Sequence, residues 1–176
     1  VLHELSDHPS LVVGHDYRSY SQSIKLALMT GLMTAGAKVY DIGLALSPTA
    51  YFAQYELDVP GVAMVTASHN ENGWTGVKMG ANRPLTFGPD EMTMLRDIVL
   101  NGTGVSREGG GYEFVPDMAE RYMADLTKRP AFKRKIKAVL ACGNGTAGIF
   151  APKTLSALDI ETVDLHCDPD FTFPNH

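Results

Sequence analysis

The stretch GVAMVTASHNENGWTGVKMG, residues 61–80, contains the pattern that decides how the chain is expected to fold. Its first five residues are apolar, which indicates a buried strand. Polar side chains follow at once, with a hydroxyl at Ser68, an imidazole at His69 and an amide at Asn70. A second, short strand is predicted at residues 75–79, antiparallel to the first because only a loop joins the two. The sequence therefore predicts a reactive polar loop at the end of a buried strand.

Strands and helices alternate on both sides of this loop. The predicted elements are strands at residues 11–14, 38–42 and 61–65 and helices at residues 24–35, 47–57 and 89–100. Such alternation is typical of α/β folds with a largely parallel sheet. We therefore predict a three-layer α/β/α architecture with a mixed, mainly parallel sheet. In such sheets ligands gather outside the carboxyl ends of the strands.

The segment NGTGVSREGGG, residues 101–111, holds five glycines and few apolar residues. This composition predicts a flexible loop, which is either a linker between domains or a long hairpin. A strand is expected at residues 112–115. We assign the first domain to residues 1–115.

A second α/β unit is predicted at residues 116–176. Its expected elements are a helix at residues 116–126, a strand at 136–141, a tight turn at 142–145, a helix at 147–158 and a strand at 161–165. One βαβ unit does not cover both faces of its own sheet, so we expect an incomplete second domain of the same α/β kind. Its exposed apolar face should associate with another copy, or leave the region from Lys135 onward poorly ordered.

Composition narrows the classes of function. The 15 Lys and Arg against 20 Asp and Glu give a net charge of −5, which argues against a nucleic-acid binder but allows a local basic pocket. An apolar run of 18 residues is absent, so we expect no membrane-spanning helix. Cys142 and Cys167 match neither a disulfide framework nor a zinc pattern, which predicts reduced thiols in a cytoplasmic protein. The six histidines show no metal-ligand spacing such as HExxH.

The polar loop contains residues suited to phosphoryl chemistry. Lys78 on the returning strand supplies a positive charge, and His69 exchanges protons near neutral pH. Gly73 and Gly76 allow the backbone to turn tightly and to approach a ligand. A hydroxyl such as that of Ser68, surrounded by these groups, suits the carriage of a phosphoryl group.

The loop at residues 15–19 follows another strand end, so Asp16 and Arg18 are expected to converge on Ser68. Two other interpretations of Ser68 are open. A serine hydrolase would use it as a nucleophile, but the flanking residues do not form the Gly-x-Ser-x-Gly elbow, and neighbouring Ser and His side chains on an extended backbone point apart. The third interpretation is a polar turn without chemistry.

Several segments together resemble the α-D-phosphohexomutase superfamily, which includes phosphomannomutase and phosphoglucomutase. The segments are TASHN at residues 66–70 with GVK at 76–78, VGHDYR at 13–18, DIG at 41–43 with SPT at 47–49, CGNGTAG at 142–148 and FPNH at 173–176. Their order and spacing are similar to the family's from about residue 11 to the end. The resemblance implies an N-terminal fragment, with the phosphoserine-loop domain at residues 1–115 and part of domain II at residues 116–176.

The resemblance also implies the chemistry. Ser68 would carry phosphate, pass it to a mannose or glucose phosphate, and take the other phosphate back from a hexose 1,6-bisphosphate. The phosphoryl group thereby moves between O1 and O6. His69 and Lys78 would accompany the transferring group and assist proton transfer, Arg18 would neutralise phosphate charge, and Asn70 would bind the phosphate.

The family resemblance further implies Mg²⁺, bound through the phosphate on Ser68, with the remaining ligands expected beyond His176. The chain departs from the family pattern at Glu71, where the family has Pro, and at Ala141, where it has Asp. The full-length protein is thus expected to be an isomerase and a phosphoprotein, and the 176 residues alone to be inactive. The alternative is a non-catalytic fragment that binds a phosphosugar or a partner protein.

Overall fold

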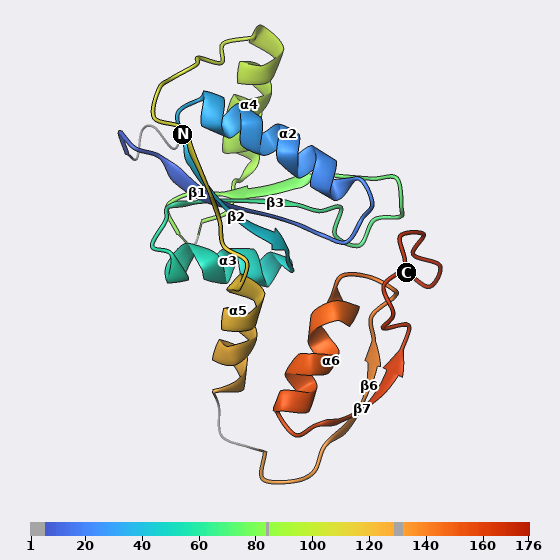
Figure 1. The fold of residues 1–176 in the computed structure, drawn as a ribbon. Helices are drawn as coiled ribbons and strands as arrows, with labels where there is room; N and C mark the ends of the chain where they lie inside the picture. Colours follow the sequence, from blue (N-terminus) through green and yellow to red (C-terminus); the bar gives the residue numbers. More distant parts are fainter. Residues whose placement is uncertain (1–5, 84, 129–131) are drawn as a thin grey trace.

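The computed structural model describes residues 6–83, 85–128 and 132–176, which form two α/β units (Figure 1). The elements of the first unit are β1 (Ser10–His15), α2 (Ser21–Thr34), β2 (Lys38–Leu44), α3 (Ser47–Glu56), β3 (Gly61–Val65), β4 (Val77–Gly80), α4 (Pro89–Asn101) and β5 (Gly111–Phe114). The remaining elements are α5 (Met118–Thr127), β6 (Lys137–Ala141), α6 (Ala147–Ala157) and β7 (Glu161–Leu165). The predicted α/β class is confirmed.

The first unit is built on a five-stranded sheet with the order β4-β3-β1-β2-β5. Strand β4 is antiparallel to β3, as its short connection requires, and the other neighbours are parallel. The mixed, mainly parallel sheet is therefore confirmed. Successive residues of β1 face opposite sides: Leu11 and Val13 pack with α2, whereas Val12 packs with α3. In Figure 1, α2 and α4 cover one face of the sheet and α3 covers the other.

Helix α2 begins at Ser21, three residues before the predicted start at residue 24. The Ser21 N–H donates to the carbonyl of Arg18 at 3.0 Å, and its hydroxyl donates to the Asp16 carboxylate. This polar anchoring starts the helix before its apolar periodicity appears. The helix ends at Thr34, and Gly36, with φ of 85°, makes the left-handed turn that its sequence position predicts.

The glycine-rich segment 101–111 is neither a domain linker nor a hairpin, because β5 pairs with β2 in parallel. It crosses the end of α2 instead. The Arg107 N–H donates to the carbonyl of Thr34 at 2.9 Å, and a Cβ added at Gly110 would lie 2.0 Å from the carbonyl oxygen of Met33. Glycine composition thus reflects close backbone packing at this point as well as a turn.

Helix α5 leads from the first unit to the second. Met118 at its start is fully buried in the core beneath α3, and the helix also packs against α6. Beyond it, β6 and β7 form a parallel pair whose outer face carries exposed Val139, Val163 and Leu165. Self-association through this face stays a prediction, as does the domain boundary after residue 115.

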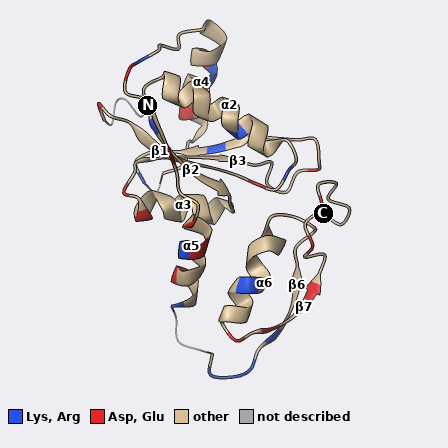
Figure 2. Ribbon diagram, in the orientation of Figure 1, with Lys and Arg blue, Asp and Glu red and all other residues tan. Residues whose placement is uncertain are grey.

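Charged residues of both signs are interspersed along the chain, with a basic run before β6 (Figure 2). That run, Lys133 to Lys135, is exposed. Along α5, Arg121 pairs with Asp117 at 3.0 Å. Of the helices in the described part of the chain, none is both long and apolar enough to cross a lipid bilayer.

A buried ion pair fixes α2 to β2 in the first unit. Lys25 Nζ lies 2.6 and 2.8 Å from the two carboxylate oxygens of Asp41, and both side chains are almost inaccessible. Asp41 also accepts hydrogen bonds from the Gly43 N–H and the Tyr112 hydroxyl. Its carboxylate is thereby satisfied on several sides, as a buried charge requires.

We predict that Lys25→Met lowers the free energy of unfolding by about 3–5 kcal/mol, because it leaves the Asp41 carboxylate buried without its cation. Urea unfolding followed by circular dichroism measures the change. Lys38→Met is the control, since Lys38 pairs with Glu113 at the surface. Equal losses in the two variants would contradict the prediction.

Candidate functional site

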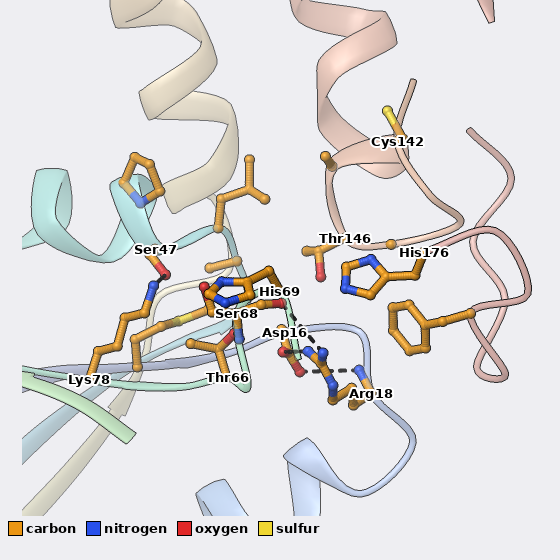
Figure 3. Close-up of a pocket in the computed structure, with 17 residues that line it drawn as sticks. Asp16, Arg18, Ser47, Thr66, Ser68, His69, Lys78, Cys142, Thr146 and His176 are labelled. Carbon is orange, nitrogen blue, oxygen red and sulfur yellow. Dashed lines mark hydrogen bonds and ion pairs between the residues drawn. The ribbon is translucent and has the colours of Figure 1, made fainter. Parts of the chain in front are cut away.

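The candidate site lies at the carboxyl ends of β1 and β3, where two loops meet (Figure 3). The strands are parallel neighbours, and the Asp16 N–H donates to the carbonyl of Val65 at 3.0 Å. The loop after β1 carries Arg18, and the loop after β3 carries Ser68. The structure therefore brings together two predicted site residues that lie 50 positions apart in the chain.

Ser68 adopts a left-handed backbone conformation, with φ of 56°. For a residue other than glycine this conformation costs on the order of 1 kcal/mol, so surrounding contacts must stabilise it. The Ser68 N–H donates to Thr66 Oγ1 at 2.9 Å, and the Asn70 N–H donates to the carbonyl of Ala67 at 3.0 Å. The turn leaves Ser68 exposed, with the residue lining a cavity.

Arg18 lies beneath this turn and holds its backbone. Its Nη2 donates to the carbonyl of Asn70 at 2.7 Å and to that of Ser68 at 3.4 Å, and its Nη1 pairs with the Asp16 carboxylate. Only 4% of Arg18 is exposed. Its Nε is buried without a hydrogen-bond partner among the described residues. The guanidinium thus supports the loop and brings a positive charge close to Ser68, while its role in neutralising phosphate stays a prediction.

The Asp16 carboxylate organises the other side of the same turn. Burial acts to raise its pKa, but hydrogen bonds from Ser21 and Thr66, and then the N–H and charge of Arg18, lower it below its usual value. The Thr66 hydroxyl donates to Asp16 and accepts from the Ser68 N–H, so it connects the Asp16 carboxylate to the backbone of Ser68. Asp16 is therefore held as a carboxylate, and its partners hold the loop.

A cavity of about 410 Å³ opens above Ser68 and is lined by both units. Figure 3 shows Lys78 and Ser47 on one side of Ser68 and Thr146 and His176 on the other. Lys78 Nζ lies 3.4 Å from Ser47 Oγ, an exposed and weak contact that leaves the ammonium available to a ligand. The cavity therefore presents cationic and hydroxyl groups around an exposed serine.

Three of the predicted residues besides Ser68 line this cavity, and one does not. His69, Lys78 and Arg18 are among its lining residues. Asn70 is exposed outside the lining and contributes its carbonyl to Arg18. Its predicted contact with phosphate stays a prediction.

Two helices begin at the cavity. The N-terminal residues of α3 and α6, including Ser47 and Thr146, line it, and neither helix has a side-chain hydrogen bond at its N-cap. The positive end of each helix dipole favours an anion at such positions. Few N–H groups are free, however, because Pro48 has none and those of Gly148 and Ile149 already donate to the carbonyls of Gly145 and Thr146. Ser47, Thr146 and His176 lie in segments that resemble the family but were not among the predicted site residues. Ser47 and Thr146 also follow strand ends, so the rule that predicted Arg18 and Ser68 would have found them.

The residues around Ser68 do not by themselves suit Mg²⁺. This cation prefers several oxygen ligands, whereas Arg18 and Lys78 are themselves cations and His69 offers only a nitrogen. The nearby Asp16 carboxylate is already paired with Arg18 and Ser21. Within residues 6–83, 85–128 and 132–176, no group of three or more His, Cys, Asp or Glu side chains could hold a metal ion. The magnesium prediction therefore stays a prediction.

Cys142 and Cys167 are both free thiols at the ends of β6 and β7. Burial and then a hydrogen bond with Cys167 raise the pKa of Cys142 to about 11. The Cys167 thiol also donates to the carbonyl of Leu140 at 3.1 Å. Because the thiolate is the reactive form, Cys142 is a poor nucleophile near neutral pH although it lines the cavity.

Comparison with known families gives two matches that together cover most of the chain. A family model described as phosphoglucomutase/phosphomannomutase, alpha/beta/alpha domain I, matches residues 1–105, and the model of alpha/beta/alpha domain II matches residues 120–176. A phosphomannomutase/phosphoglucomutase of Pseudomonas aeruginosa is 30% identical over 168 residues, which is 96% of this chain and 36% of the relative. A probable phosphoglucosamine mutase of Methanocella arvoryzae is 30% identical, covering 95% of this chain and 38% of the relative. The chain thus spans little more than a third of these relatives.

Solved structures show the same likeness. A phosphoglucomutase/phosphomannomutase family protein from Burkholderia thailandensis superposes with a TM-score of 0.86 at 31% identity, over 96% of this chain and 38% of that one. A putative phosphomannomutase from Thermus thermophilus superposes with a TM-score of 0.78 at 26% identity, over 98% and 40%. The arrangement of both units therefore matches known folds.

We predict that Asp16→Asn lowers the free energy of unfolding by about 3–5 kcal/mol near neutral pH, because it leaves the Arg18 guanidinium buried without its anion and weakens the hydrogen bonds from Ser21 and Thr66. The folded pKa of Asp16 lies below its usual value of 3.8, so its contribution is present above 3.8 and is lost as the pH falls through the folded pKa. The difference between parent and variant should therefore shrink in acid. Urea unfolding across a pH series measures it, and a difference that stays constant down to strongly acidic pH would contradict the prediction.

Proposed function

The chain belongs to the phosphoglucomutase/phosphomannomutase family, and from this premise we propose that the protein containing it moves a phosphoryl group between O1 and O6 of a hexose phosphate. The observation that supports this most directly is the exposed Ser68 on a fixed turn, facing a cavity with Lys78, His69 and two helix N-termini. The relatives' names indicate the substrate class, and mannose and glucose phosphates are the substrates we propose.

Ser68 serves as the phosphate carrier in this proposal. In the first transfer the bond between Ser68 Oγ and phosphorus breaks, and a bond forms between phosphorus and the free hydroxyl oxygen of the hexose phosphate. The hydroxyl loses its proton to a nearby base, and Ser68 Oγ regains one. The product is a hexose 1,6-bisphosphate, which turns over and returns its other phosphoryl group to Ser68 by the reverse steps.

The neighbouring residues supply charge and position. Phosphoryl transfer depends mainly on in-line placement and on neutralising the oxygens of the transferring group. Lys78 offers an ammonium with only a weak protein contact, and Arg18 places its guanidinium under the carbonyls of the turn. His69 and Lys78 both line the cavity beside Ser68, so we assign proton transfer to one of these two side chains.

The first prediction from the proposed function concerns Ser68, the proposed phosphate carrier. In the protein that contains this chain, Ser68→Ala should abolish both covalent phosphate and mutase activity, because no other oxygen occupies its place on the turn. Incubation with hexose 1,6-bisphosphate followed by intact-mass and peptide analysis measures the phosphate, and a coupled assay measures turnover. Ser106→Ala, in the glycine-rich segment away from the cavity, is the matched control.

Phosphate carried by Ser68 without any turnover would support the alternative, a non-catalytic protein that binds a phosphosugar or a partner. Unchanged activity in Ser68→Ala would sink the carrier role outright. Labelling of Ser68 by a fluorophosphonate would instead favour the serine hydrolase.

A second prediction concerns charge at the cavity. Lys78→Met should lower kcat by about 10²–10³-fold, because a cation is lost where negative charge is transferred. Lys78→Arg keeps the charge and should retain much more activity. Equal kcat values in the two variants would show that the Lys78 charge does not act on the transferring group.

A further inference from the structure

The aromatic ring of Tyr17 joins the two units beside the cavity. It stacks on Phe171 of the second unit with ring centroids 4.6 Å apart and an interplanar angle of 12°. The Tyr17 N–H also donates to the hydroxyl of Thr146 at 2.9 Å. One residue of the β1 loop therefore contacts both the turn before α6 and the loop after β7.

Phe171 is held from a second direction by the loop that carries Ser68. Asn72 Nδ2 donates to the carbonyl of Phe171 at 3.0 Å. Phe171 thus contacts the ring of Tyr17 and the amide of Asn72. The loop after β7 makes a further contact with the first unit, because the Arg18 guanidinium lies 5.1 Å from the centroid of the Phe173 ring.

The same β1 loop also holds the turn of Ser68. Arg18, the residue after Tyr17, donates to the carbonyls of Ser68 and Asn70. Tyr20 accepts a hydrogen bond from the Gly73 N–H at 2.9 Å and donates to the carbonyl of Trp74 at 2.7 Å. A single short loop therefore lies between the phosphate-carrying turn and the second unit and contacts both.

The other junction between the units is of a different kind. It is an apolar seam where α3, α5 and α6 meet, lined by residues such as Leu46, Tyr122 and Phe150. Apolar contacts of this sort are non-directional, so they favour association without fixing one orientation. A stacked ring pair with hydrogen bonds on both sides is directional, and it lies next to the cavity.

We propose that Tyr17 is a positioning residue, which fixes the second unit so that Thr146 and His176 face Ser68 across the cavity. It does not touch the reacting atoms, because it acts through Thr146 and Phe171. The expected effect of Tyr17 on turnover rests on the proposed mutase function. The expected effect of Tyr17 on the placement of the two units is independent of that function.

The first test measures placement in the 176-residue chain by residual dipolar couplings of backbone amides. The parent and Tyr17→Phe, which keeps the ring stack, should each fit one alignment tensor for both units. Tyr17→Leu and Phe171→Leu should each require two, while the secondary shifts within each unit stay unchanged. One tensor shared by both units in Tyr17→Leu, or two tensors in the parent, would overturn the proposal.

The second test measures turnover in the protein that contains this chain. Loss of one aromatic pair corresponds to a change of about three- to tenfold, so kcat should fall by that factor in Tyr17→Leu and remain near the parent value in Tyr17→Phe. The double variant Tyr17→Leu with Phe171→Leu should fall no further than either single variant, because both remove the same contact. Additive losses would overturn the proposal. An inactive parent would remove the proposed function and leave the placement result standing.

Discussion

The ion pair between Asp16 and Arg18 is the interaction on which the candidate site depends. It joins two charges that are both nearly inaccessible to solvent, so neither is stable there without the other. Because each also bonds to its surroundings, the pair connects the end of β1 to the start of α2 and to the turn of Ser68. The strained backbone of Ser68 persists because these contacts determine it from several sides.

This pair also clarifies what Arg18 contributes. The family resemblance assigns it to phosphate neutralisation. In the structure its Nη2 donates to two carbonyls of the turn, and its Nη1 pairs with Asp16. Because the guanidinium is also paired with the Asp16 carboxylate, its role in neutralising phosphate stays a prediction. The Arg18 Nε is buried and has no hydrogen-bond partner among the described residues.

Much of the site was predictable from sequence because one rule places it. The predicted strand ends at residues 14 and 65 lie side by side in a parallel sheet, where β1 in fact extends to His15. Their loops therefore meet at one edge, so the meeting of Arg18 and Ser68 followed from the alternation of apolar runs. Applied again after β2 and β6, the rule would have selected Ser47 and Thr146. The rule does not specify which side chains of a loop face the cavity. Asn70 lies in the predicted loop, yet it is not among the residues that line the cavity.

Contacts between distant segments could not be predicted from the pattern of apolar and polar residues. Residues 101–111 contain five glycines, which indicate conformational freedom but not the parallel pairing of β5 with β2 or the packing of Gly110 on Met33. The stack of Tyr17 on Phe171 is a similar case, because nothing local to either residue marks the other. Such contacts depend on how whole units pack, and the helical and strand periods of the sequence do not encode that.

The division of the cavity between two units has a mechanical consequence. Transfer of a phosphoryl group tolerates little misplacement, and a shift of about 1 Å in a positioned group lowers a rate by about 10²-fold. Ser68 and Lys78 belong to the first unit, whereas Thr146 and His176 belong to the second, so no adjustment within either unit alone sets the distance between them. That distance is set where the units touch. Beside the cavity they touch through Tyr17, Arg18 and Asn72. The loop after β1 therefore contributes both to the geometry of the turn and to the placement of the opposite wall.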